Sequence, residues 1–157
     1  MSSFLGNSPP PTAAEEPVIE NDGWFPDIDL AKLRATARLD GTVTPARLHH
    51  SAINAVASIN AELAAYKAAQ SALGRARLAD VPAHVLGGES VQLMHYRRAV
   101  YSTVQADLIE RYRDFDTTGA GDKAAEKLEM RIDDLRRDVR WAISDLLGIR
   151  RTVVELI

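Results

Sequence analysis

The chain has 157 residues and a net charge of −3, so it is long enough for one domain with a core and too acidic to favour generic DNA binding through phosphate neutralisation. The absence of cysteine excludes disulfides, thiolate metal sites and cysteine nucleophiles, and it suits a reducing cytosol. No apolar run reaches the roughly 18 residues of a membrane span, and the first residues lack the pattern of a signal peptide.

The first 23 residues form a proline-rich segment with few large apolar side chains. Three consecutive prolines, Pro9–Pro11, favour a polyproline II conformation. Such a segment cannot bury enough apolar surface to offset the entropy of ordering it. We therefore expect residues 1–23 to be an extended N-terminal arm that makes few contacts with its own domain and is ordered by neighbouring subunits or other proteins.

The segment WFPDIDL, Trp24–Leu30, joins this arm to a run of helical pattern. Two aromatics, a proline and two acids could mark the edge of a metal or carbohydrate site, the first turn of a folded body, or a motif that another protein binds. Asp29 suits the N-cap of a short helix over Leu30–Leu39, which Gly41 ends. We therefore interpret the segment as the hinge between arm and body.

Three aromatic residues lie off every predicted core face. Trp24 and Phe25 precede the first helix, and Trp141 is on the rim of the last one. They either anchor the arm on the chain's own helices or belong to a subunit interface, where aromatic residues concentrate.

Three long amphipathic helices follow the short one. Thr44 caps the first of them, with Pro45 in the first helical position, and Gly74 stops it. The second runs over about Glu89–Phe115, and the third opens at Asp122. Apolar residues recur at steps of three and four along each helix, which marks one buried face. They are Leu48, Ala52, Val56, Ile59, Leu63, Tyr66 and Leu73; Leu93, Tyr96, Val100, Val104, Leu108 and Tyr112; and Leu128, Ile132, Leu135, Val139, Ala142, Leu146 and Ile149.

These elements predict an all-α fold, an antiparallel bundle of three long helices and one short helix, over residues 24–149. Residues 75–88 are expected to be a linker, and residues 116–121 a flexible turn. Gly148 is the expected C-cap of the last helix. The remaining residues, 150–157, contain the β-branched, apolar sequence TVVELI and are expected to form a strand-like tail.

Residues that could carry chemistry do not combine into a site. His49 and His50 are adjacent, so on a helix they point about 100° apart and cannot chelate one metal ion as an i,i+4 pair would. The glycines of Gly119–Asp122 precede a helix but lack the upstream strand and the Gly-Lys-Ser/Thr ending of a phosphate loop. We therefore expect no enzymatic activity, no metal and no cofactor.

The arginines are predicted to be ion-pair partners more than phosphate ligands. Arg111 follows Asp107 and Arg137 follows Asp133, both at the i,i+4 spacing. No aromatic residues interleave with the basic ones, as a platform for stacked bases requires. A dimeric helical regulator that binds DNA or a protein stays open as the alternative function.

A series of short motifs resembles the head completion/stabilisation protein, gpL family, of contractile-tailed temperate phages. The resemblance covers residues 25–157 and departs most in the N-terminal leader. The motifs are WFPDID (24–29), TVTPARL (42–48), RLADVP (77–82), GES (88–90), YRRAV (96–100), ERYRDFD (110–116), GDK (121–123) and RRDVRWAI (136–143).

The resemblance implies a structural protein of the virion neck, made in the host cytoplasm. It would be a helical adaptor that forms a ring, usually of twelve copies, below the portal protein. This ring would retain the packaged DNA with only non-specific contacts to it, and would offer a platform to the next connector or tail terminator. No membrane is involved. Arg75 and Arg77 are the expected basic band of the DNA channel.

The C-terminal tail is the expected contact with the portal. An extended, β-branched segment can add a strand to an exposed sheet edge, with alternate side chains in pockets. The residues assigned to this docking are Arg150, Arg151, Val153, Val154, Leu156 and Ile157. The alternative is that the tail folds back onto the bundle as a lid.

Overall fold

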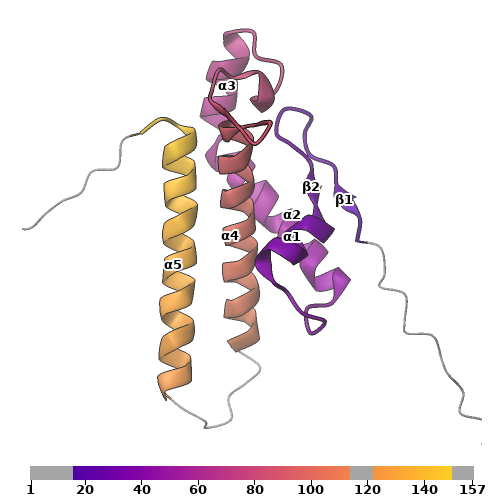
Figure 1. The fold of residues 1–157 in the computed structure, drawn as a ribbon, viewed down its shortest axis with the longest axis vertical. Coiled ribbons are helices and arrows are strands. Elements are labelled where there is room, and N and C mark those ends of the chain that lie inside the picture. Colours follow the sequence, from indigo (N-terminus) through magenta and orange to yellow (C-terminus); the bar gives the residue numbers. More distant parts are fainter. Residues whose placement is uncertain (1–15, 114–121, 150–157) are drawn as a thin grey trace, which may run out of the picture.

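The computed structural model describes residues 16–113 and 122–149 (Figure 1). Residues 1–15, residues 114–121 and the predicted docking tail, 150–157, lie outside the described residues. The described chain is mostly helical, with five α-helices, one 3₁₀ turn and two small sheets. The prediction of an all-α fold is therefore confirmed in the broad sense of a helical protein.

The two longest helices form an extended pair at one side of the molecule. α4 (Val91–Arg113) and α5 (Asp122–Leu146) lie alongside each other over most of their length (Figure 1). On its other side α4 packs against α2 (Pro45–Glu62) and, more briefly, α1 (Leu30–Ala37). The central position of α4 explains why Tyr96, Val100 and Val104 are completely buried.

The predicted helix starts are confirmed in their capping geometry. The Asp29 side chain accepts a hydrogen bond from the backbone N–H of Lys32 at 3.0 Å, and Thr44 accepts one from Arg47 at 3.4 Å. At the other end, Gly148 has φ of 68° and donates to the Asp145 carbonyl, as the glycine after a helix end does. These signals depend on a few neighbouring residues, so the local sequence is sufficient to specify them.

The first long helix departs from its prediction. It is divided at Leu63 into α2 and α3 (Ala64–Ala72), although Leu63 N–H still bonds the Ile59 carbonyl. The predicted stripe weakens beyond this point: Tyr66 of α3 still packs against the core, but α3 has no fully buried residue. The last predicted core position, Leu73, is 70% exposed.

The predicted linker over residues 75–88 has regular structure. It contains the 3₁₀ turn η1 (Leu78–Asp80), whose Leu78 is completely buried, and strand β3 (Val85–Leu86). Strand β4 (Glu89–Ser90) pairs antiparallel with β3 across Gly87 and Gly88. Both glycines have positive φ, 59° and 82°, which a tight two-residue hairpin turn requires.

The N-terminal prediction is wrong for the part of the arm that is described. Strand β1 (Val18–Ile19) pairs antiparallel with β2 (Ile28–Asp29), and Ile19 is only 6% exposed. Glu16 accepts a hydrogen bond from Arg34 Nε at 2.7 Å. Residues 16–23 therefore belong to the folded body, because they contribute an apolar anchor, a strand pairing and an ion pair.

Candidate interaction surfaces

Trp24 and Phe25 are inside the core of their own chain. They are 5% and 3% exposed, so of the two alternatives, anchoring on the chain's own helices or a subunit interface, the structure supports the first. The Trp24 and Phe25 rings meet edge to face at 4.8 Å between centroids, and Phe25 stacks on Tyr96 of α4 at 4.8 Å. The aromatic pair fills the space between the N-terminal segment, α4 and the segment after α3, which no helical stripe could have indicated.

Trp24 is held through both its indole and its backbone. Trp24 Nε1 donates to the Arg75 carbonyl at 3.1 Å, while the Trp24 carbonyl accepts from the Leu78 N–H at 2.8 Å. Together these bonds tie the predicted linker to the predicted hinge. Arg75 therefore has a structural contact through its backbone, and its side chain is half-buried. Arg77 is exposed and pairs with Asp80 at 3.2 Å.

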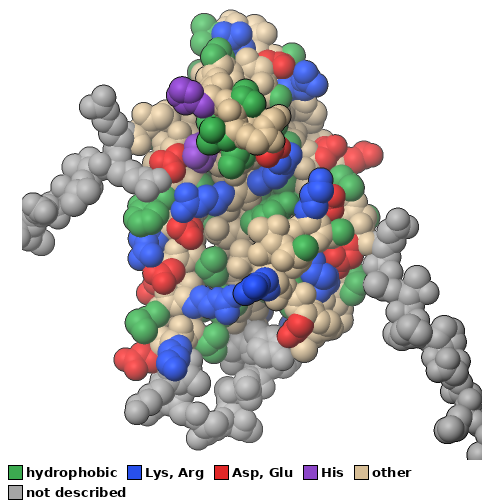
Figure 2. Space-filling model, in the orientation of Figure 1, with side chains coloured by type: hydrophobic (Ala, Val, Ile, Leu, Met, Phe, Trp, Pro, Cys, Tyr) green, Lys and Arg blue, Asp and Glu red, His purple; other side chains and the backbone are tan. Residues whose placement is uncertain are grey.

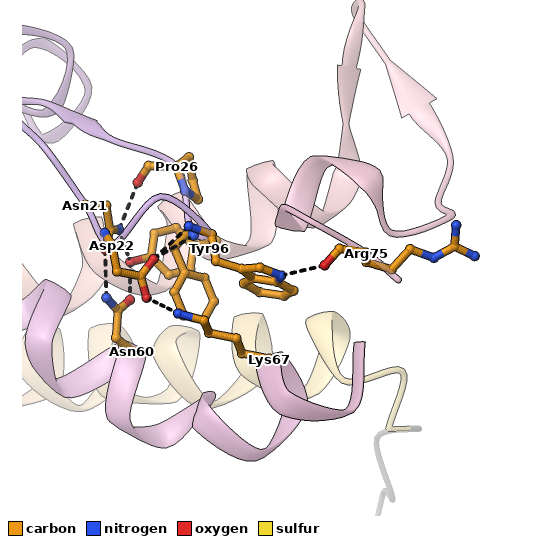
Figure 3. A network of polar contacts seen from close by, with 9 residues as sticks. Asn21, Asp22, Pro26, Asn60, Lys67, Arg75 and Tyr96 are labelled. Carbon is orange, nitrogen blue, oxygen red and sulfur yellow. Dashed lines mark hydrogen bonds and ion pairs between the residues drawn. The ribbon is translucent and has the colours of Figure 1, made fainter. Parts of the chain in front are cut away.

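A polar network surrounds the aromatic pair (Figure 3). Tyr96 Oη donates to Asn60 Oδ1 at 2.6 Å, Asn60 Nδ2 donates to Asn21 Oδ1 at 2.8 Å, and Asn21 Nδ2 donates to Tyr96 Oη at 2.9 Å. The three groups form a closed cycle in which each donates once and accepts once. Burial raises the pKa of Tyr96 well above its ordinary value, so its hydroxyl stays a donor.

Asp22 closes the turn between β1 and β2. Its Oδ1 accepts from the backbone N–H groups of Trp24 and Phe25, both at 3.0 Å, and its Oδ2 accepts from Lys67 Nζ at 2.7 Å. Burial alone would raise the pKa of Asp22, but these hydrogen bonds, from Lys67 first, bring it below its ordinary value. The carboxylate therefore carries its charge at neutral pH and fixes the start of the aromatic pair.

Ion pairs connect the outer helices. Arg98 of α4 reaches Asp138 of α5 at 2.8 Å, and Arg136 of α5 reaches Glu110 of α4 at 2.8 Å. The predicted pair of Asp107 with Arg111 is confirmed at 2.8 Å, and Asp107 also accepts from Ser51 of α2. These contacts hold the α4–α5 pair in register along its length.

Arg137 has a different partner from the predicted one. It pairs with Asp134 at 2.7 Å, whereas the sequence analysis assigned it to Asp133. Residues three apart and four apart on a helix are both within reach of a long arginine side chain, so the spacing alone does not decide between them. The pair lies on the outer side of α5.

The outer face of α5 carries a stripe opposite its core stripe. Met130, Asp134, Arg137 and Trp141 recur at steps of four, three and four residues, which places them on one side of the helix. Met130 is 60% exposed, and the Arg137 guanidinium lies 4.9 Å from the Trp141 ring centroid. Of the three aromatics singled out from the sequence, Trp141 alone is at the surface. Figure 2 shows acidic and basic side chains interspersed along this edge of the molecule.

A second group of exposed apolar side chains comes from α3, the β3–β4 hairpin and the first turn of α4. Val85 and Leu86 are on β3, Leu73 follows α3, and Met94 is in the first turn of α4; all are at least 43% exposed. An ion pair between Glu89 of β4 and Arg97 of α4 braces the β3–β4 hairpin. A rigid hairpin with two exposed apolar residues is a suitable protein contact.

Two kinds of site are absent from the described residues. Within residues 16–113 and 122–149, no group of three or more acidic or histidine side chains is placed to hold a metal ion. In the same ranges, no helix combines the length and the apolar character that crossing a bilayer requires. The arrangement can form interfaces, and the comparisons with known proteins decide its family.

The pattern of the family described as phage head completion protein (GPL) matches residues 19–157 of the chain. The chain belongs to this family. The head completion/stabilization protein of Escherichia phage P2 is 45% identical to it over 148 residues, which are 94% of this chain and 88% of that protein. No solved structure matches the chain.

Membership in the head completion family makes the chain a structural protein of a phage particle, as the resemblance in the motifs implied. The family match begins at Ile19, within β1, and therefore includes the buried strand, the Asp22 turn and the aromatic pair. The sequence analysis assigned these residues to an arm and a hinge. No local turn signal marks this hairpin, because residues 20–27 connect its strands and a two-residue Asp-Gly turn does not.

Proposed function

We propose that this protein assembles as a ring directly below the portal, closes the DNA-filled capsid and presents a platform to the next connector or tail component. The observation that carries the proposal is the 45% identity, over nearly the whole chain, with a protein named for head completion and stabilization. Exposed apolar residues on the α5 edge and at the α3 end supply surfaces for two kinds of neighbour.

The test is the mass of the complexes that the purified protein forms alone and with isolated portal. A ring adaptor is expected to be monomeric alone and to add to the portal in a fixed ratio. A dimer that ignores the portal would instead favour the alternative, a helical regulator. A Trp141→Ser variant, compared with Thr36→Ser at an exposed position of α1, separates contacts of the α5 outer face from general surface effects.

We further propose that the C-terminal tail is the contact with the portal. The sequence TVVELI follows α5 and its Gly148 cap, with Arg150 and Arg151 between. Burial of Val154, Leu156 and Ile157 contributes about 1.5–3 kcal/mol each before the cost of ordering them. When each subunit of a ring makes the same weak contact with the portal, the ring as a whole binds much more tightly than one subunit.

Deletion of residues 152–157 is therefore expected to abolish assembly onto portal while leaving the helical circular dichroism and the melting temperature nearly unchanged. Replacement of Val154 and Leu156 by serine should have the same effect with the chain length preserved. Normal assembly of either variant, or loss of the fold, would contradict a docking role.

The channel of such a ring is proposed to contact DNA only non-specifically. The net charge of −3 per chain favours a lumen that DNA slides through. Arg75 and Arg77 are its candidate basic band, although the ion pair of Arg77 with Asp80 and the half-burial of Arg75 reduce the charge they present. A double replacement of these arginines by glutamine should alter DNA retention in particles without altering ring mass.

A further inference from the structure

A groove opens between the segment after α1 and the α4–α5 pair, on the part of the chain that matches the family. It has a volume of about 320 Å³. Its walls are mainly apolar, with an exposed arginine on either side, Arg38 and Arg131. The apolar lining consists of Ala37, Leu39, Val43, Leu108, Ile109 and Leu128. A space of this size fits one or two large side chains.

The described chain begins next to this groove. The Arg34 guanidinium, which has only hydrogen-bond donors, donates to three oxygens: Glu16 Oε1 at 2.7 Å, the Asp40 carbonyl at 2.9 Å and the Val43 carbonyl at 2.8 Å. Asp40 and Val43 both line the groove. One side chain therefore connects the residue from which the leader, residues 1–15, departs with the wall of the groove.

The leader carries an apolar pair at a suitable distance. Phe4 and Leu5 are adjacent, and ten residues, Gly6–Glu15, separate them from Glu16. At about 3.1–3.4 Å per residue, these ten residues span up to roughly 30 Å, which exceeds what is needed to enter a groove beside Glu16. The leader has no lysine or arginine and one acid, Glu15, so the two rim arginines do not repel it.

The C-terminal tail is a poorer fit to the same groove. Arg131 precedes Ile149 by 18 positions on α5, or roughly 27 Å at 1.5 Å per residue. A fully extended chain spans about 3.3–3.6 Å per residue. Residues 150–157 would therefore have to lie fully extended back along α5 to reach Arg131 at the groove.

We propose that Phe4 and Leu5 of the leader bind in this groove of their own chain. The leader, which lies outside the family match, then covers an apolar surface that belongs to the matched part. The tether at Glu16 favours the intramolecular contact, because it keeps the pair at a high effective concentration near the groove.

The absence of native cysteine allows a clean test by disulfide formation. The double variant Ser3→Cys/Arg131→Cys places one thiol beside the apolar pair and one on the groove rim. The matched control is Ser3→Cys/Arg140→Cys, which also replaces an exposed arginine of α5 but lies about two and a half turns further on. Both are oxidised mildly as full-length protein, and the products are followed by non-reducing electrophoresis and mass spectrometry.

The groove pair is expected to form its intramolecular disulfide about tenfold faster than the control pair. Addition of Phe4→Ser and Leu5→Ser should reduce its rate to that of the control, with unchanged helical circular dichroism. Equal rates in the two pairs, or a rate that Phe4→Ser/Leu5→Ser leaves unchanged, would overturn the proposal. Disulfide-linked dimers as the main product would also overturn it, since the groove would then take the leader of a second copy.

Discussion

At the scale of single residues, Tyr96 connects three parts of the chain that are distant in sequence. Its hydroxyl completes the cycle with Asn21 and Asn60, and its ring stacks on Phe25. Because the tyrosine is completely buried, water cannot replace a lost partner. The side chain of Tyr96 therefore links the N-terminal segment, α2 and α4.

Tyr96→Phe is expected to lower the free energy of unfolding by about 1–3 kcal/mol, because it leaves the amides of Asn21 and Asn60 with an unmet hydrogen bond in a buried site. Urea denaturation measures the loss. The control is Tyr101→Phe, because the Tyr101 hydroxyl forms no hydrogen bond with the described residues. A loss of equal size in both variants would show that the cycle contributes little.

Asp22 is expected to make stability depend on pH in the acid range. Its pKa is lowered on folding, so its contribution is complete above the unfolded pKa of about 3.9 and is lost as the pH falls through the folded pKa. Asp22→Asn should therefore be less stable than the wild type at pH 7, with a difference that shrinks below about pH 4. The effect is modest, because the side chain is 34% exposed. Thermal unfolding from pH 3 to pH 7, with exposed Asp133→Asn as the charge-matched control, measures it.

At the scale of elements, the helix ends could be predicted from signals within a few residues. The contacts between distant parts of the chain could not be predicted in this way. Asp29, Thr44 and Gly148 cap helices through bonds to near neighbours, so their sequence context predicts them. The burial of Trp24 depends on the carbonyl of Arg75, about 50 positions away, and has no helical period. Short hairpins were missed because two-residue strands are too brief to show an alternating pattern.

α3 is expected to be the least protected helix in solution. It has no fully buried residue, and five of its nine residues are alanine, so its helicity depends on propensity more than on packing. Hydrogen exchange should show residues 64–72 exchanging much faster than the buried turns of α4 around Val100. Ala68→Gly should accelerate the exchange of α3 further, at a cost of about 1 kcal/mol to its local opening. Protection of α3 equal to that of α4 would contradict this view.

At the scale of the whole molecule, part of the segment that composition assigned to an arm belongs to the folded body. Residues 16–23 fold with the helices through Ile19, Asn21 and Asp22. A segment of low average hydrophobicity can belong to a core when one or two of its residues fill a specific space.

Two N-terminal deletions should therefore differ sharply. Removal of residues 1–15 is expected to retain the cooperative unfolding transition, with a small change in midpoint. Removal of residues 1–23 takes away the buried Ile19 and leaves Tyr96 and Asn60 without Asn21, at a cost of at least about 3 kcal/mol. Melting curves of the two truncated proteins measure the contrast, and similar midpoints would place the boundary elsewhere.

The different surroundings of the two tryptophans give the protein two intrinsic optical probes. Trp24 is enclosed at 5% exposure, while Trp141 is 36% exposed beneath a guanidinium on the outer side of α5. A soluble quencher such as acrylamide should therefore quench the fluorescence of Trp141 and leave that of Trp24 largely unquenched. The native emission then separates into an accessible and a quencher-resistant fraction. The quencher-resistant fraction responds to unfolding, and the accessible fraction responds to any partner that covers α5. Fluorescence from a single unlabelled sample thus distinguishes loss of structure from association.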